Sequence, residues 1–144
     1  MYLDSAIIVK LFIPEPDSGF YASLVDGRAD LAVSALSLPE CRSALARKLD
    51  GGEITQDEYR EACGEMDEIF SGRAGIAVAG VDNDILQLAA LLIERCQGRV
   101  ALRALDAVHI ATCMNNGNYP LATNDKTMRK AAEALQVSLA PLPK

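Results

Sequence analysis

The chain has 144 residues, of which 50% are hydrophobic and 24% are charged, and this composition excludes a disordered or collagen-like protein. Its 14 basic and 20 acidic side chains give a net charge of −6, which argues against a protein that coats nucleic acid with positive charge. Nucleic acid stays open as a substrate, because carboxylates can hold a metal in a site.

Four cysteines lie in apolar helical patterns, and none belongs to a CxxC pair. We therefore expect them to be reduced, buried core residues in a cytoplasmic protein. The sequence has no apolar run long enough to span a membrane and no signal-peptide pattern at its start, so we expect no membrane association. No linker divides the chain, which predicts a single domain over residues 1–144.

Short apolar strands alternate with helices along the chain. In order, the expected elements are a strand at 1–4, helices at 5–13 and 18–25, a strand at 31–34, helices at 37–49 and 55–71, a strand at 76–81, a helix from a cap at Asp82 or Asn83 to Cys96, a loop at 97–105, a helix at 106–114, a strand at 119–123, a helix at 126–135 and a strand at 137–140. This alternation predicts an α/β fold, with a parallel sheet covered by helices on both faces.

Four acidic residues stand at the ends of these elements. Asp4 ends an expected strand and Asp125 follows another, whereas Glu40 lies in the first turn of an expected helix and Asp106 opens the next buried one. In an open parallel sheet, the carboxyl ends of the strands and the amino ends of the following helices face one crevice. The four carboxylates can therefore converge there.

Each acid also has a purely structural interpretation. Glu40 fits a capping box with Ser37, and Asp106 and Asp125 fit helix caps. Asp4 sits between apolar neighbours, where a carboxylate needs a partner, and backbone N–H groups are one such partner. The joint pattern favours a functional role more than any single residue does.

A cluster of carboxylates has a restrictive chemistry. Carboxylates that share a pocket repel one another, and a hard cation such as Mg²⁺ or Mn²⁺ removes that repulsion. Such an ion also polarises a phosphate and activates a water. These are the two requirements of phosphodiester hydrolysis.

Four segments of the chain resemble the acidic motifs of PIN-domain ribonucleases, in the order of that family. They are Tyr2-Leu-Asp4-Ser-Ala, Ser37-Leu-Pro-Glu40-Cys-Arg-Ser-Ala-Leu45, Leu105-Asp106-Ala-Val-His-Ile-Ala111 and Ala122-Thr-Asn-Asp125-Lys. The resemblance runs from Met1 to about Val137 and is greatest to the VapC toxins of toxin–antitoxin pairs. It implies a three-layer α/β/α fold with a central parallel sheet and Mg²⁺- or Mn²⁺-dependent endonuclease activity on RNA.

The resemblance also implies roles for individual residues. It gives the chain an acidic quartet, which consists of Asp4, Glu40, Asp106 and Asp125. It matches three polar residues that would orient carboxylates or waters, namely Ser5, Thr123 and Asn124. It further implies a homodimer, an RNA substrate and a small antitoxin whose C-terminal segment enters the active-site groove.

The mechanism that we expect divides the quartet. Asp4, Asp106 and Asp125 hold one or two metal ions, directly or through water, and Glu40 helps to position a metal-bound water that attacks. In-line attack on phosphorus then leaves 5′-phosphate and 3′-hydroxyl ends. Among the basic residues, Arg103 and Lys126 are the expected RNA contacts, because each lies within three residues of a quartet acid.

Several alternatives stay open. The one histidine, His109, lies on a nearly all-apolar helix and is expected to be a packed, hydrogen-bonded core residue more than a general base. The main alternative function is a catalytically silent PIN-like binding module. An aspartyl-phosphate enzyme is less favoured, since Ala6 stands where a D-x-D motif needs its second acid. A serine or cysteine hydrolase is also less favoured, because the chain has no G-x-S-x-G motif.

Overall fold

The computed structural model describes all residues from 1 to 144 and has one sheet at its centre. Four short parallel strands form it: β1 (Tyr2–Leu3), β2 (Ala32–Ser34), β3 (Ala77–Ala79) and β4 (Leu121–Ala122). Their spatial order is β3-β2-β1-β4. The two central strands are entirely buried, as in sheets that helices cover on both faces.

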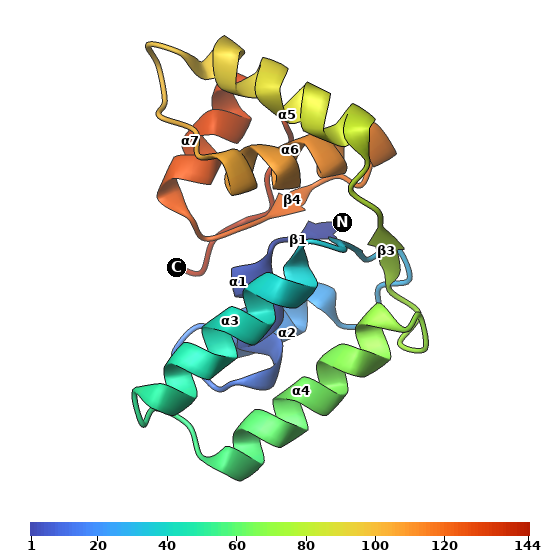
Figure 1. Cartoon of the computed structure of the whole chain (residues 1–144), viewed down its shortest axis with the longest axis vertical. Helices are drawn as coiled ribbons and strands as arrows, with labels where there is room; N and C mark the ends of the chain where they lie inside the picture. The colour runs from blue at the N-terminus through green and yellow to red at the C-terminus, as the bar shows by residue number, and fades with distance from the viewer.

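Seven helices form the two outer layers. They are α1 (Ser5–Phe12), α2 (Ser18–Val25), α3 (Ser37–Asp50), α4 (Gln56–Phe70), α5 (Asn83–Cys96), α6 (Ala104–Asn116) and α7 (Lys126–Ala134). Figure 1 shows α1 to α4 on one side of the strands and α5 to α7 on the other. The expected three-layer α/β/α fold is thus confirmed.

Each outer layer packs its own hydrophobic core against the sheet. Successive side chains of a strand point to opposite faces, so Leu3 joins the core beneath α1 to α4 while Tyr2 joins the core beneath α5 to α7. Leu121 and Ala122 of β4 divide in the same way. All four cysteines are free and buried, as expected.

The strand order places a crevice beside β1. The chain proceeds from β1 to β2 and β3 in one direction, then crosses back to β4 on the opposite side of β1. Ligands bind outside the carboxyl ends of strands at such a reversal of strand order. Asp4 follows β1 and Asp125 follows β4, which brings both residues to this crevice.

Side-chain caps fix where four of the helices begin, namely α1, α4, α5 and α7. Asp4 accepts a hydrogen bond from Ile7 N at 2.9 Å, and Asp82 accepts one from Ile85 N at 3.0 Å. Thr55 and Glu58 form the expected capping box of α4. These local signals explain why the helix starts at 5, 56 and 83 agree closely with the sequence pattern.

Two expectations need correction. Helix α6 begins at Ala104, before Asp106, so Asp106 lies inside the first turn and does not cap it. The expected strand at 137–140 is only an isolated bridge between Leu121 and Leu139. Pro141 and Pro143 follow directly, and a proline has no N–H with which to extend a ladder.

None of the helices is both long and apolar enough to cross a lipid bilayer.

Candidate active site

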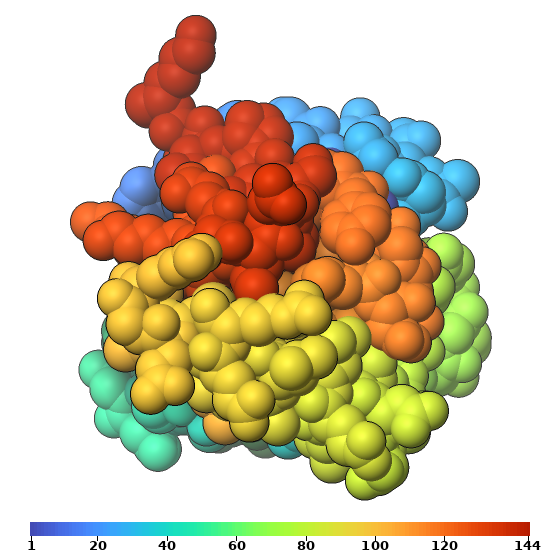
Figure 2. Space-filling model, turned by 90° about the horizontal axis from the view of Figure 1, so that it is seen from above, coloured from blue at the N-terminus to red at the C-terminus, as the bar shows by residue number.

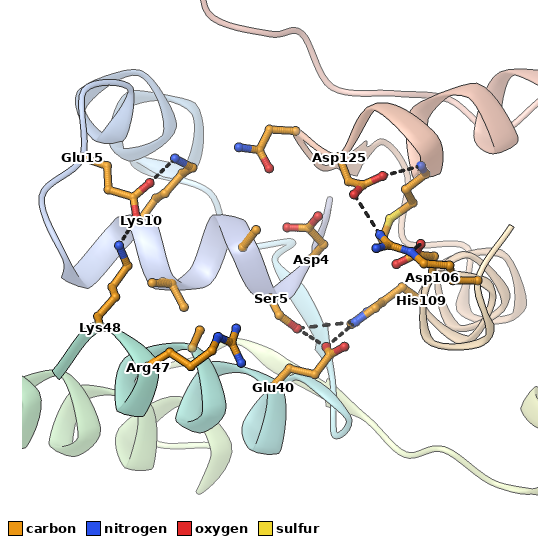
Figure 3. Close-up of a pocket in the computed structure, with 16 residues that line it drawn as sticks. Asp4, Ser5, Lys10, Glu15, Glu40, Arg47, Lys48, Asp106, His109 and Asp125 are labelled. Atoms are coloured by element: carbon orange, nitrogen blue, oxygen red, sulfur yellow. Dashed lines mark hydrogen bonds and ion pairs between the residues drawn. The ribbon is translucent and has the colours of Figure 1, made fainter. Parts of the chain in front are cut away.

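A groove with a volume of about 470 Å³ opens at the carboxyl end of the sheet, and all four acids of the quartet line it. Figure 3 shows Asp4 near its middle, Glu40 on one wall, and Asp106 and Asp125 on another. Asp4 directly follows β1, Glu40 lies in α3, Asp106 lies in α6 and Asp125 directly precedes α7, so the fold brings together residues that are far apart in the sequence.

Asp4 is the most buried acid of the groove, with 3% of its surface exposed. Burial raises the pKa of its carboxyl, and hydrogen bonds from the Thr123 hydroxyl and from Ile7 N only partly offset this rise. The Asp125 carboxylate raises the pKa further, which shows that the two charges lie close enough to repel. Asp4 therefore caps α1 and carries a costly buried charge at the same time.

Asp106 and Asp125 share one cationic partner. Arg103 Nε donates to Asp106 Oδ2 at 2.7 Å, and Arg103 Nη2 donates to Asp125 Oδ2 at 2.9 Å. Asp125 also caps α7 by accepting from Met128 N at 2.8 Å, as its structural interpretation predicted. The cap uses Oδ1, so it leaves Oδ2 directed to the guanidinium.

Glu40 does not form the capping box with Ser37 that would have explained it structurally. Leu36 is the residue before α3, and the buried Ser37 hydroxyl has no hydrogen-bond partner. Glu40 Oε2 instead accepts from the Ser5 hydroxyl and lies 2.6 Å from His109 Nε2 (Figure 3). Burial alone would raise the pKa of Glu40, but His109 and Ser5 outweigh it and hold the pKa below its usual value.

The three expected orienting residues occupy different positions around the acids. Ser5 donates to Glu40, and the buried Thr123 hydroxyl contacts Asp4 and accepts from Asp125 N at 3.1 Å. Asn124 lines the groove. The geometry thus connects Ser5 and Thr123 directly to quartet carboxylates.

The far end of the groove is cationic. Lys10, Arg47 and Lys48 line it, and Glu15 lies between the two lysines (Figure 3). Arg47 bonds only the Ser43 hydroxyl and pairs with no carboxylate. Of the two expected RNA contacts, Arg103 lines the groove, whereas Lys126 is not among its lining residues.

No three acidic, histidine or cysteine side chains lie close enough together in the structure to hold a metal ion. The donor set nevertheless fits a hard divalent cation, because every quartet side chain offers carboxylate oxygen. The structure supports this fit, because the positively charged Arg103 guanidinium already bridges the Asp106 and Asp125 carboxylates. Asp4 is a further carboxylate of the groove and lies near Asp125.

Two residues of the groove have contacts there that the sequence did not assign to them. His109 is buried and hydrogen-bonded, as expected, but its partner is a quartet acid. Its position one helical turn after Asp106 was the available signal. Arg47 lies two turns after Glu40 on α3, and the same spacing argument would have placed it on the groove side.

Comparisons with known proteins show the family to which the chain belongs. The family model of the PIN domain matches residues 1–134. The chain is 34% identical over 141 residues to ribonuclease VapC46 of Mycobacterium tuberculosis, covering 96% of this chain and 95% of that protein. It is 26% identical to ribonuclease VapC45 of the same species, covering 98% of this chain and 94% of that protein.

Solved structures share the fold at low sequence identity. VapC20 of Mycobacterium tuberculosis, a toxin that cleaves the sarcin–ricin loop, aligns with a TM-score of 0.71 at 18% identity over 90% of this chain and 93% of its own. FitAcB of Neisseria gonorrhoeae aligns with a TM-score of 0.67 at 18% identity over 96% of this chain and 94% of its own.

Proposed function

The chain belongs to the PIN-domain family, among the VapC-type ribonucleases, and from this premise we propose that it is a metal-dependent endoribonuclease toxin. One observation carries the proposal: Asp4, Glu40, Asp106 and Asp125 line one groove at the reversal of strand order. The curated relatives that span the same length are named ribonucleases. The substrate is RNA, and the reaction is hydrolysis of its phosphodiester bonds.

The four acids have different roles, which follow from their positions in the groove. Asp4, Asp106 and Asp125 would hold Mg²⁺ or Mn²⁺, since Asp106 and Asp125 share one wall of the groove and Asp4 lies near its middle. When bound, the ion supplies a Lewis acid for a phosphate oxygen and lowers the pKa of water. Glu40, on the opposite wall, orients the attacking water through its carboxylate.

The polar neighbours hold these carboxylates in place. Thr123 orients Asp4 through its hydroxyl, and Ser5 orients Glu40. Asn124 lines the groove beside Asp125 and offers an amide to the substrate. Attack in line with the departing 3′ oxygen then leaves a 5′-phosphate and a 3′-hydroxyl.

The charges along the groove suit an RNA strand. The cationic end with Lys10, Arg47 and Lys48 accepts the phosphates that flank the cleaved one, and Arg103 contacts the strand at the acidic end. Lys126 follows Asp125 at the start of α7 and meets the strand outside the groove. The chain has no tryptophan and only 5% aromatic residues, so shape and phosphate contacts outweigh base stacking.

The same groove is the site of control. We propose that a small antitoxin inserts its C-terminal segment there and excludes RNA. We also propose a homodimer, for which α5 offers a candidate surface: its Leu86, Leu91 and Ile93 are large, apolar and exposed. Figure 2 shows the face of the molecule that α5 (yellow) covers.

The decisive experiment incubates the purified chain with a pool of structured RNAs. We expect cleavage with Mg²⁺ or Mn²⁺, none with a chelator, and none with Asp106→Asn, which keeps the size of the side chain and removes its charge. A melting temperature equal to that of the wild type would show that the variant is folded. Cleavage by Asp106→Asn would contradict the proposal, and absence of both cleavage and metal binding would favour a silent binding module.

A further inference from the structure

His109 connects a buried tyrosine to the acid on the far wall of the groove. We propose that Tyr2 fixes which nitrogen of His109 carries the proton, and that His109 thereby acts as a positioning residue for Glu40. Its effect on cleavage rests on the proposed function, whereas the proton arrangement is a property of the folded chain alone. The inference stands on three contacts between residues from β1, α1, α3 and α6.

The first contact sets the hydrogen-bond donor. The Tyr2 hydroxyl lies 2.7 Å from His109 Nδ1, and both side chains are buried. A tyrosine phenol, with an ordinary pKa of about 10, keeps its proton at neutral pH. Tyr2 donates that proton to Nδ1, which must then be the unprotonated nitrogen of the imidazole.

The second contact follows from the first. In a neutral imidazole whose Nδ1 accepts, Nε2 carries the proton. His109 Nε2 lies 2.6 Å from Glu40 Oε2, so it donates to the carboxylate. The orientation of the ring is fixed as well, because Tyr2 and His109 pack edge to face with their ring centres 5.9 Å apart.

The third contact shows what the arrangement does for Glu40. The Ser5 hydroxyl donates to the same Oε2 that His109 reaches, and no hydrogen bond within the chain uses Oε1. The Glu40 side chain is 24% exposed and lines the groove. Two donors on one oxygen thus immobilise a flexible side chain and leave its second oxygen to accept from a water or from the substrate.

The single histidine of the chain makes the proton arrangement directly measurable. In an untagged chain labelled with ¹⁵N-histidine, every imidazole signal belongs to His109. We expect a protonated Nε2 and an unprotonated Nδ1 at neutral pH without metal. Tyr2→Phe removes the donor to Nδ1 and is expected to shift protonation toward Nδ1, and Glu40→Gln is expected to move the Nε2–H proton signal.

A matched pair of substitutions tests the positioning role. The amide nitrogen of glutamine can replace Nε2, whereas the shorter asparagine reaches only the position of Nδ1. His109→Asn is therefore expected to lower kcat by about 10- to 100-fold, a size typical of residues that orient reactive groups from behind. His109→Gln is expected to restore part of that loss, although both variants remove the same ring from the core.

A double substitution separates positioning from packing. If His109 acts through Glu40, adding His109→Asn to Glu40→Gln should lower kcat little more than Glu40→Gln does alone, because the two residues act as a unit. A mainly structural role would instead lower the melting temperature of both His109 variants and lower kcat equally in either background.

Two results would overturn the inference. One is a proton on Nδ1 in the wild type, and the other is equal kcat for His109→Asn and His109→Gln. If the wild-type chain cleaves no RNA, the proposed function fails, and the nitrogen signals alone then decide whether Tyr2 and Glu40 set the state of His109.

Discussion

The charge of Asp4 costs the folded chain stability that the proposed activity requires. The carboxyl is almost fully buried, and its pKa is raised, mainly by burial. A raised carboxyl pKa means that the folded state binds its proton more tightly than the unfolded chain does. Stability is therefore lost as the pH rises from the usual value of 3.8 through the raised pKa of the folded state.

Asp4→Asn is expected to abolish cleavage and to raise the melting temperature in the presence of a chelator at neutral pH. The amide oxygen still accepts from Ile7 N, so the helix cap survives while the buried charge is lost. We expect an increase of a few degrees, on the scale of about 2–4 °C per kcal/mol for a chain of this size. Asp82→Asn is the control, since Asp82 makes the same cap at an exposed position. A lower melting temperature for Asp4→Asn alone would contradict the argument.

The pKa of Glu40 is shifted in the opposite direction to that of Asp4, although both residues line the same groove. Burial would raise its pKa, but the hydrogen bonds that Glu40 accepts from His109 and from the Ser5 hydroxyl lower it. A depressed carboxyl pKa contributes stability that is present above the usual value of 4.5 and is lost as the pH falls through the folded value. The two acids should therefore respond to pH in opposite directions.

Glu40→Gln is expected to lower the free energy of unfolding by about 1 kcal/mol at pH 7, the net worth of a hydrogen bond to a charged group that is partly exposed. The difference from the wild type should shrink as the pH falls below 4.5. Urea denaturation at several pH values measures both quantities. A difference that stays constant down to pH 3 would show that the His109 and Ser5 contacts do not favour the charged carboxylate.

At the scale of elements, the starts of the helices were predictable because their signals are local. Asp4, Thr55 and Asp82 each cap a helix with a side chain that lies within one turn of its bonded N–H group. The start of α6 has no such signal: Arg103 precedes the helix and makes no cap bond. Asp106 therefore looked like a cap in the sequence, whereas its partner is the Arg103 side chain.

The expected strand at 137–140 shows what a sequence pattern alone cannot predict. An apolar run followed by prolines has the composition of a strand, but only pairing with a neighbour makes it one. Leu121 N donates to Ser138 O, and Ala140 N donates to Leu121 O, after which the prolines end the pairing. Similarly, no local pattern shows that His109 faces Glu40, since these residues meet only when α6 and α3 lie on opposite faces of the sheet.

Arg103 links the first turns of α6 and α7 by bridging Asp106 and Asp125. A divalent ion that uses these two carboxylates competes with the guanidinium for the same Oδ2 atoms. Arg103→Gln is therefore expected to tighten Mn²⁺ binding, by no more than about fivefold, because the Arg103 side chain is 66% exposed and such ion pairs are weak.

Calorimetric titration with Mn²⁺ measures this change without any RNA. Arg99→Gln is the control, since Arg99 is an exposed arginine outside the groove. Weaker Mn²⁺ binding by Arg103→Gln would instead mean that the guanidinium organises the two carboxylates for the ion.

At the scale of the whole molecule, the net charge of −6 opposes the approach of RNA, so affinity depends on where the few cations lie. Four of them line the groove, and three of these already pair with carboxylates. Lys10 pairs with Glu15 and Asp17, Lys48 pairs with Glu15 and Glu53, and Arg103 pairs with two acids of the quartet. Arg47 is the exception, because its only partner is a hydroxyl. It lies seven residues after Glu40 on α3, about 10 Å further along the helix axis.

Arg47→Gln is therefore expected to raise KM for RNA several-fold and to leave kcat nearly unchanged, because a phosphate away from the reacting bond binds equally in the ground and transition states. The slope of log KM against log salt concentration should fall by about 0.7, the value for one lost contact to a single strand. Arg99→Gln, the matched exposed arginine outside the groove, should change neither quantity. An unchanged slope for Arg47→Gln, or an equal change for Arg99→Gln, would mean that the strand does not follow the groove to its cationic end, and that the chain draws its affinity from the acidic end through the metal.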